Sequence, residues 1–519
     1  MKFINEQTYE NYIKKNQANL FHKKFDNAVQ NLKKGFGNVN HPIIIDNEKI
    51  YTEDKYKHTS PIDRRIVIGY VSKVTDELIN KAIESSFQSF MDWSKFDYHN
   101  RIKILKKAAN TIRSKKFELA ALLTFENGKN RYEAIADIDE AIDFIDYYCM
   151  DMINNNGYIT KNKRQVKIEK NISVMKPYGV WGIISPFNFP AAIFVGMSIG
   201  AIITGNTAVV KPASNTPIIG YKLLEIMMDS GIPAGVLNYI TGDAANIGRI
   251  IINSNKISGI VFTGSKDVGY DIFKNSLTIK PRPIIAELGG KNPTIVTETA
   301  DLDKAAEGVS KAAFSYGGQK CSACSRVYVQ KDIKNEFIEK LISNVKKIHI
   351  DNPEKKDSDL GPLINSTAFQ NFKKYVNIAE EKGQILYGGK VMDEGDLKYG
   401  YYVKPTIVNG LSSENILLKK ELFLPFLCIK EYDKFDEAIV LCNNSEYGLT
   451  AGIYSNDKEQ INDFLNNIEA GVVYVNRQKS STTGALVGKQ SFGGWKSSGI
   501  SGKGTGGKYY LTQFMREQS

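Results

Sequence analysis

The chain has 519 residues, which is enough for two or three domains with a sizeable core. Hydrophobic residues make up 42% and charged residues 24%, so the composition excludes a disordered or collagen-like chain. The net charge of +11 comes from 68 Lys and Arg against 57 Asp and Glu, spread in short runs along the chain. This spread favours a solvated, lysine-rich surface over a nucleic-acid-binding protein.

Cysteine usage and the N-terminus indicate a cytoplasmic protein. There are five cysteines, an odd number that argues against a disulfide scaffold. The N-terminal sequence lacks the apolar core of a signal peptide. Residues 177–210 carry no charge, but proline, glycine and asparagine interrupt them repeatedly. We therefore expect a buried strand, a loop and a buried helix there, and no membrane span.

The first part of the chain predicts helices followed by a hairpin. In the helix predicted at residues 101–112, four apolar residues share one face: Ile102, Leu105, Ala109 and Ile112. Residues 116–123 and 134–148 continue the helical character. From residue 165 to residue 174 the period changes to two, with Val166 and Ile168 on one arm and Ile172 and Val174 on the other. This pattern predicts a β-hairpin that leaves the main body.

Residues 180–296 alternate short apolar strands with helices, and the same pattern resumes after Cys321. Within the first block, residues 216–231 predict a helix that Gly231 is placed to end. Strand–helix repetition implies a parallel sheet with helices on both faces. We therefore predict an α/β fold with two consecutive parallel-sheet, Rossmann-like domains. Their join lies near residues 287–293, and the β-hairpin is an addition to them.

Cys321 and Cys324 have the spacing C-x-x-C, which suits half a zinc site, a dithiol pair or one reactive cysteine with a bystander. Zinc needs four ligands and the histidines are scattered, so we expect no metal. A thioredoxin-like pair would open a helix in a small domain. A reactive cysteine needs a base, and Glu287, at the end of a buried strand, is the best candidate. Cys324 is then a packing residue, although a regulatory disulfide between the two remains an alternative.

Three glycine-rich stretches are candidate phosphate loops. "GKGTGG" has no strand and helix after it, and "GALVGK" is too short for a Walker A loop. "FTGSKDVG" is different, because a strand runs through Gly264 and Ser265 into a helix. The amides at the start of that helix could hold a pyrophosphate, and a plain strand–helix turn is the alternative.

Nine motifs in order give the chain a family resemblance. They are "PFNFP", "GNTAVVKPA", "FTGS", "ELGGKNP", "GQKC", "GPLI", "ELFLPF", "YGLTAGIYS" and "QSFGGWKSSG". From Ile43 to the C-terminus the chain resembles the aldehyde dehydrogenases. The resemblance implies an NAD(P)-binding domain at 1–150 and 176–288 and a catalytic domain at 289–472. It also implies an oligomerisation flap, an aldehyde-anchor loop and a C-terminal tail at 151–175 and 473–519, and hence a homo-oligomer.

The resemblance also assigns roles to residues. Cys321 resembles the nucleophile that attacks the aldehyde, and Asn188 with the backbone amide of Cys321 resembles the oxyanion hole. Glu287 resembles the base that activates water to hydrolyse the thioester. The implied cofactor is NAD or NADP, at positions that match the family's cofactor contacts: Ser185, Pro186, Lys211, Ser214, Gly242, Gly264, Ser265, Leu288, Glu421 and Phe423.

Two of these motifs depart from the family pattern. Ser214 stands where NAD-preferring members usually have a glutamate that grips the ribose and repels a 2′-phosphate. Serine cannot repel that phosphate, so we expect NADP to be accepted. Leu424 stands where the family usually has a glycine, so the local backbone must avoid positive φ there.

The C-terminal region and "GQKCSACSR" resemble the 1-pyrroline-5-carboxylate dehydrogenases within the family. In that subfamily a hydroxyl and two amides bind the substrate carboxylate, and the matching residues are Ser322, Gly484 and Ala485. Phe189 and Phe492 would pack against the aliphatic part of the substrate. The implied reaction is oxidation of L-glutamate 5-semialdehyde to L-glutamate, in proline and arginine catabolism.

Several alternatives stay open. Gly484 and Ala485 could form an ordinary turn, and Glu133 or a neighbour could meet the substrate amine. A dehydrogenase of succinate semialdehyde would more often hold the carboxylate with arginine, for which Arg477 and Lys479 are candidates. A catalytically inactive structural relative is the alternative from another class.

Overall fold

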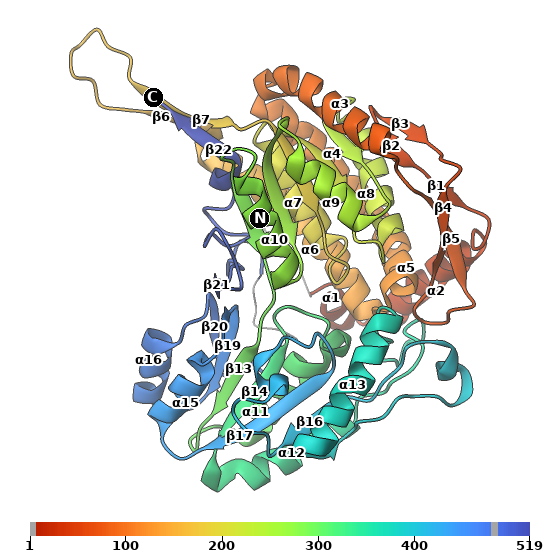
Figure 1. The fold of residues 1–519 in the computed structure, drawn as a ribbon, viewed down its shortest axis with the longest axis vertical. Helices are drawn as coiled ribbons and strands as arrows, with labels where there is room; N and C mark the ends of the chain where they lie inside the picture. Colours follow the sequence, from red (N-terminus) through yellow and green to blue (C-terminus); the bar gives the residue numbers. More distant parts are fainter. Residues whose placement is uncertain (1–6, 479–485) are drawn as a thin grey trace.

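Two seven-stranded sheets organise the chain, one in each half of the molecule (Figure 1). The computed structural model describes residues 7–478 and 486–519. Each sheet is mostly parallel and carries helices on its faces, which confirms the predicted α/β fold. The domain boundaries themselves remain a prediction.

The first sheet has the strand order β12-β11-β8-β9-β10-β2-β3, and its five strands from β12 to β10 run parallel. Its strands are β2 (Ile43–Ile45), β3 (Glu48–Ile50), β8 (Val180–Ile184), β9 (Thr207–Lys211), β10 (Leu237–Tyr239), β11 (Ile257–Thr263) and β12 (Ile284–Glu287). They are rich in Ile and Val because helices cover both faces of the sheet.

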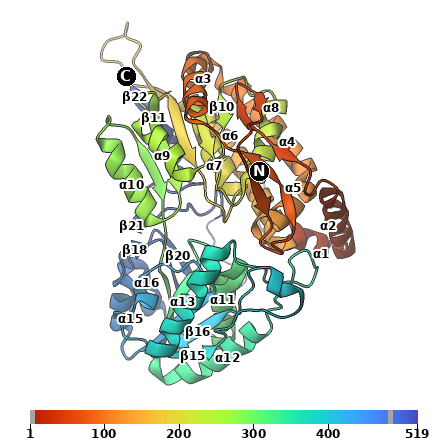
Figure 2. The same ribbon diagram turned by 45° about the vertical axis from the view of Figure 1, so that its right-hand side comes forward.

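Helices divide between the two faces of this sheet (Figure 2). One face is covered by α3 (Asp76–Lys95), α9 (Ala244–Asn253) and α10 (Lys266–Leu277). The other packs against α4 (Tyr98–Ser114), α5 (Lys116–Asn127), α6 (Arg131–Asn154), α7 (Ala192–Ile203) and α8 (Pro217–Asp229), with α1 (Thr8–Lys14) and α2 (Ala18–Lys33) beyond them.

Two predictions about these helices are confirmed. The four apolar residues predicted to share a face on α4 are all buried. The uncharged stretch at residues 177–210 forms β8, a loop and the almost wholly buried helix α7, followed by β9. Among the described residues, no helix has the length and apolar character needed to cross a bilayer.

The second sheet has the order β15-β16-β17-β14-β13-β19-β20 and is parallel except for β15. Its strands are β13 (Asn292–Val296), β14 (Cys324–Gln330), β15 (Gln384–Tyr387), β16 (Thr406–Asn409), β17 (Phe426–Tyr432), β19 (Thr450–Tyr454) and β20 (Val472–Val475). Its helices are α11 (Leu302–Phe314), α12 (Lys334–Lys346), α13 (Ser366–Lys382), α14 (Ile416–Lys419), α15 (Phe435–Asn443) and α16 (Lys458–Asn467).

Smaller elements complete the fold. β1 (Asn40–His41), β4 (Lys55–Thr59) and β5 (Val67–Ser72) form one small sheet, and β18 (Tyr447–Gly448) pairs with β21 (Trp495–Lys496). The short 3₁₀ helices are η1 (Asn156–Tyr158), η2 (Ser315–Gly318), η3 (Lys331–Ile333), η4 (Gly395–Tyr399) and η5 (Leu511–Phe514).

The predicted hairpin exists, but its first strand lies elsewhere. β6 (Ile159–Lys161) pairs with β7 (Ile172–Pro177), and the C-terminal strand β22 (Met515–Gln518) completes an antiparallel sheet that projects from the first half (Figure 1). Val166 and Ile168 belong to the connection between β6 and β7, and Ile168 is 93% exposed. The prediction failed because alternation fixes a strand only where one face is buried.

Two glycines allow a test of stability, because one has a left-handed backbone conformation after a helix and the other lies inside a helix. Gly231 follows α8 with φ +111°, where an added Cβ would meet only Ile104 at 3.9 Å. Gly231→Ala should therefore destabilise the fold by about 1 kcal/mol through backbone strain alone. Gly248 lies inside α9 with open space around it, so Gly248→Ala should stabilise by up to about 1 kcal/mol. Thermal unfolding followed by circular dichroism should shift in opposite directions, and shifts in the same direction would contradict the roles given to these two glycines.

Candidate active site

The cofactor candidates gather at one edge of the first sheet. β8 to β12 all end at the same edge, and Ser185, Lys211, Gly242, Ser265 and Glu287 lie at or just after these strand ends. From β8 the chain goes to β9 on one side and later returns to β11 on the other. Crevices at such a reversal of strand order bind nucleotide cofactors in doubly wound sheets.

The residues at this edge fit a dinucleotide. Lys211 is buried, donates from Nζ to the carbonyl of Pro212 at 2.6 Å, and burial lowers its pKa to about 8. Its remaining donor capacity suits a ribose hydroxyl. Ser265 precedes α10 without a capping hydrogen bond from its own side chain, so the first amides of α10 suit a pyrophosphate. Ser214 is exposed, and its carbonyl accepts a hydrogen bond from the Tyr56 hydroxyl at 3.4 Å.

Two of the cofactor candidates, Glu421 and Phe423, lie beside the link between the two sheets. Glu421 Oε1 accepts a hydrogen bond from the Gly290 amide at 2.9 Å, and burial raises the pKa of Glu421 to about 7. The Phe423 ring lies edge to face with the Phe187 ring, with centroids 5.7 Å apart. Leu424 avoids positive φ, as predicted, and the left-handed residue is Phe423 instead, with φ +57°.

Asn292 holds the loop that carries Cys321, here named the cysteine loop. The sequence alone assigned no role to Asn292. Asn292 donates from Nδ2 to the carbonyls of Cys321 at 2.7 Å and Ala323 at 2.9 Å, and its Oδ1 accepts from the Thr450 amide at 3.0 Å. Asn292 therefore ties the loop to β13 and β19. The motif "ELGGKNP" contains Asn292 and could have drawn attention to it. The sequence alone does not show which groups form hydrogen bonds with its amide side chain.

Burial is the main cause of the shifted pKa values of Cys321 and Glu287. Burial, and then the Glu421 and Glu287 carboxyls, raise the pKa of the Cys321 thiol to about 12, while the amides of Ser322 and Cys321 act to lower it. Burial also raises the pKa of Glu287 well above its ordinary value, against a hydrogen bond from the Gly494 amide. Glu287 Oε2 is buried with no hydrogen-bond partner among the described residues.

One cavity of about 950 Å³ brings the substrate candidates together. Its walls include Cys321, Ser322, Phe189 and Phe492, and among the charged residues that line it are Lys129, Glu133 and Lys320. Asn188, immediately before Phe189, is 3% exposed. Gly484 and Ala485 lie outside the described residues, but the neighbouring Leu486 and Val487 line the same cavity.

Cys324 packs in the core of the second sheet. It is 3% exposed, its Sγ lies 3.2 Å from Thr294 Oγ1, and burial raises its pKa to about 11. All five cysteines are free thiols. Across residues 7–478 and 486–519, His, Cys, Asp and Glu do not cluster in threes as they would around a metal ion.

Comparison with known proteins settles the family. The sequence profile described as "Aldehyde dehydrogenase family" matches residues 50–519. The chain belongs to the aldehyde dehydrogenase family. A relative named 1-pyrroline-5-carboxylate dehydrogenase 1, from Halalkalibacterium halodurans, is 38% identical over 503 residues, covering 96% of this chain and 95% of that one. A 1-pyrroline-5-carboxylate dehydrogenase from Bacillus mycoides is 38% identical over 484 residues, covering 92% of each chain.

Solved structures agree with this assignment. A point mutant of the Thermus thermophilus 1-pyrroline-5-carboxylate dehydrogenase has a TM-score of 0.91 and 33% identity, covering 96% of this chain and 95% of that one. A Thermus enzyme of that name with bound NAD has the same TM-score, identity and coverage. Betaine aldehyde dehydrogenase from Staphylococcus aureus in complex with NAD⁺ has a TM-score of 0.88 and 29% identity, covering 95% and 96%.

The thiol of this aldehyde dehydrogenase should be unreactive until the pH is high. Because the pKa of Cys321 is raised, the thiolate fraction should grow about tenfold per pH unit up to about pH 10, and iodoacetamide alkylation of the cofactor-free enzyme should follow it. Glu421→Gln removes a charge that forms above about pH 7, so it should speed alkylation at higher pH. Mass spectrometry of the Cys321 peptide, with Cys321→Ala as control, gives the rate. A plateau near pH 8 would contradict the raised pKa.

Proposed function

We propose that this aldehyde dehydrogenase oxidises L-glutamate 5-semialdehyde, the open form of 1-pyrroline-5-carboxylate, to L-glutamate with NAD⁺ or NADP⁺. The observation that carries the proposal is the cavity at Cys321, which combines two phenylalanine rings, the Ser322 position and the Glu133 carboxylate. Such a wall suits a short aliphatic chain that ends in a carboxylate and an amine. The names of the relatives support the same substrate.

In the proposed reaction, Cys321 Sγ attacks the aldehyde carbon and gives a thiohemiacetal. The Asn188 amide group and the Cys321 backbone amide donate hydrogen bonds to the developing oxyanion. The thiol proton leaves to solvent, and loss of a hydride from the former aldehyde carbon, for which a bound nicotinamide would be the two-electron acceptor, converts the thiohemiacetal into a thioester. The thioester that remains on Cys321 is then attacked by water, from which Glu287 takes the proton. This step releases L-glutamate and the free thiol.

Recognition of the amino-acid end would be shared between two sets of groups. The Ser322 hydroxyl, with the amides of Gly484 and Ala485, would bind the α-carboxylate without a buried counter-charge. Glu133, whose Oε1 lies 3.2 Å from Lys320 Nζ, would accept from the amine. Phe189 and Phe492 would pack on the methylene groups.

The cavity disfavours succinate semialdehyde as the substrate. Among the described residues, Arg477 is absent from the cavity wall, and Lys479 lies outside the described residues. Succinate semialdehyde has no amino group that could donate a hydrogen bond to the Glu133 carboxylate. The Glu133 carboxylate therefore favours the substrate that carries an α-amino group.

The remaining parts of the proposal concern cofactor and assembly. Ser214 carries no charge that would repel a 2′-phosphate, so NADP⁺ should serve beside NAD⁺. The projecting sheet of β6, β7 and β22 would mediate a cytoplasmic homo-oligomer, because exposed apolar residues such as Ile159, Ile168 and Ile172 lie on the hairpin.

An activity panel tests the substrate and the cofactor together. Glutamate 5-semialdehyde and succinate semialdehyde are each assayed with NAD⁺ and NADP⁺. The first should have a kcat/KM about a hundredfold higher than the second, since unpaired polar groups penalise the wrong substrate strongly. Cys321→Ala should abolish turnover. Equal rates for both aldehydes would overturn the substrate, and a hundredfold preference for NAD⁺ would overturn the interpretation of Ser214.

Ser322→Ala isolates the proposed carboxylate contact. Loss of one hydrogen bond to a charged group costs about 1.5–3 kcal/mol, so KM for glutamate 5-semialdehyde should rise about tenfold or more with kcat little changed. Propanal has no carboxylate and serves as the control substrate, for which KM should stay the same. A parallel rise in both KM values would instead indicate a general disturbance of the cysteine loop.

A further inference from the structure

A fully buried ion pair lies at the wall of the substrate cavity, where Lys129 is one of the lining residues, and it has no part in the proposed chemistry. Lys129 Nζ lies 2.8 Å from Asp137 Oδ2, and each side chain is at most 1% exposed. Burying two charges costs several kcal/mol per ion unless their geometry and other contacts compensate. The other contacts of this pair therefore matter.

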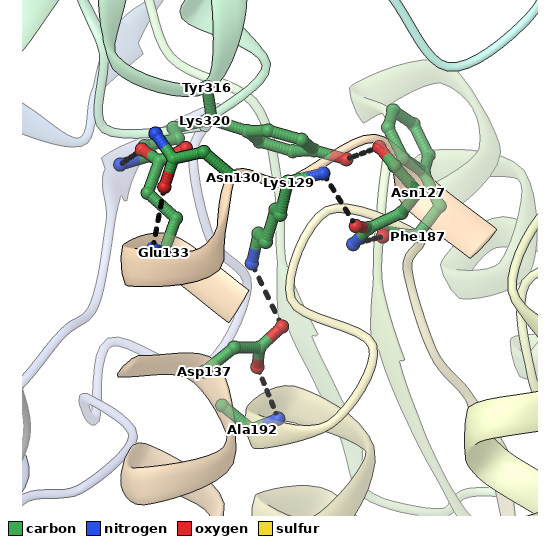
Figure 3. A network of polar contacts seen from close by, with 9 residues as sticks. All are labelled: Asn127, Lys129, Asn130, Glu133, Asp137, Phe187, Ala192, Tyr316 and Lys320. Carbon is green, nitrogen blue, oxygen red and sulfur yellow. Dashed lines mark hydrogen bonds and ion pairs between the residues drawn. The ribbon is translucent and has the colours of Figure 1, made fainter. Parts of the chain in front are cut away.

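Those contacts hold residues 187–192, the segment that carries Asn188, and Figure 3 shows Phe187 and Ala192 at its two ends. Asp137 Oδ1 accepts a hydrogen bond from the amide of Ala192, the first residue of α7, at 2.8 Å. Lys129 Nζ lies 3.9 Å from the centroid of the Phe189 ring. A desolvated cation over an aromatic ring contributes about 2 kcal/mol. Phe189 and Ala192 are thus fixed by one ion pair, and Asn188 is the neighbour of Phe189.

The same cluster reaches the cysteine loop. Lys129 Nζ also lies 5.1 Å from the centroid of the buried Tyr316 ring, five residues before Cys321. The Tyr316 hydroxyl donates to the carbonyl of Asn127 at 2.8 Å, and Asn127 Nδ2 reaches the carbonyl of Phe187 at 3.5 Å. The end of α5 therefore contacts both the loop of the nucleophile and the loop of the oxyanion donor (Figure 3).

We propose that Lys129, held by Asp137, is a positioning residue that sets Asn188 and Phe189 relative to Cys321. The proposal rests on the roles proposed above for those three residues. Hydrogen-bond donors to an oxyanion act only when they are preorganised, and a misplacement of about 1 Å can cost a hundredfold in rate. A buried ion pair between the α5–α6 loop and α6 supplies that preorganisation from the wall of the cavity.

Lys129→Met tests the proposal because methionine keeps the apolar stem and removes the ammonium group. We expect kcat to fall about 10–100-fold both for glutamate 5-semialdehyde and for propanal, since every aldehyde needs the oxyanion donor. The dissociation constant of NADH and the alkylation rate of Cys321 should change by less than about threefold, because neither depends on Asn188. Lys129→Arg should recover part of the lost kcat.

A matched control separates positioning from stability. Lys116 on α5 pairs with Asp139 on α6 at 3.1 Å, with 16% and 1% of the side chains exposed. Lys116→Met breaks another largely buried pair that ends on α6, and neither Lys116 nor Asp139 lines the cavity. It should lower the unfolding temperature and leave kcat unchanged. If Lys116→Met lowers kcat as much as Lys129→Met does, the effect is structural and the proposal fails.

A double variant covers the case in which Lys129→Met does not fold. Lys129→Met with Asp137→Leu removes both charges, which often restores stability when a buried pair is replaced by apolar groups. The folded double variant should still show the reduced kcat, and wild-type kcat would overturn the proposal. Propanal keeps this test distinct from the substrate proposal: an enzyme inactive on glutamate 5-semialdehyde but active on propanal would still report on Lys129.

Discussion

The short crossing between the two sheets is the constraint on which the candidate site depends. Residues 288–291 join the carboxyl end of β12 to the amino end of β13. This link brings the edge at which the cofactor candidates gather to the edge at which the cysteine loop begins. Glu287 is the last residue of β12, and Asn292, the first residue of β13, bonds the carbonyl of Cys321. The proposed base and the proposed nucleophile lie 34 positions apart in the sequence, and a link of four residues positions one relative to the other.

Burial at this junction serves binding and acid–base chemistry at once. Water-poor surroundings raise the pKa of Cys321 and of Glu287 and lower that of Lys211. Each of these groups is thus closer to its neutral form at rest than it would be in water. A bound cofactor and substrate bring their own charges and dipoles into the same surroundings, where electrostatic interactions are strong. Electrostatic interactions in the site should therefore be strongest when cofactor and substrate are both bound.

Much of the fold and of the site could be predicted from the sequence because the signals were local. Strands that run into glycine or serine, and motifs such as "ELGGKNP", were located within a few residues of the observed elements. The first arm of the hairpin was misplaced because Val166 and Ile168 are both exposed, so their alternation carried no information about burial. Asn292 and Lys129 were missed for another reason. Their partners lie far away in sequence, and no periodicity encodes a hydrogen bond to a loop or a cation behind a ring.

The loop before β17 shows how a departure from the family pattern is absorbed. Leu424 replaces a usual glycine, yet its side chain is 4% exposed within the core of the second half, and its φ is not left-handed. Phe423 takes the left-handed conformation instead, which costs a non-glycine residue about 1–3 kcal/mol. Phe187 packs against the Phe423 ring on one side, and the carbonyl of Leu424 lies so close to Gly318 that a Cβ there would be 2.3 Å away. The close approach of Leu424 to Gly318 also joins the loop that carries Glu421 to the glycines that precede Cys321.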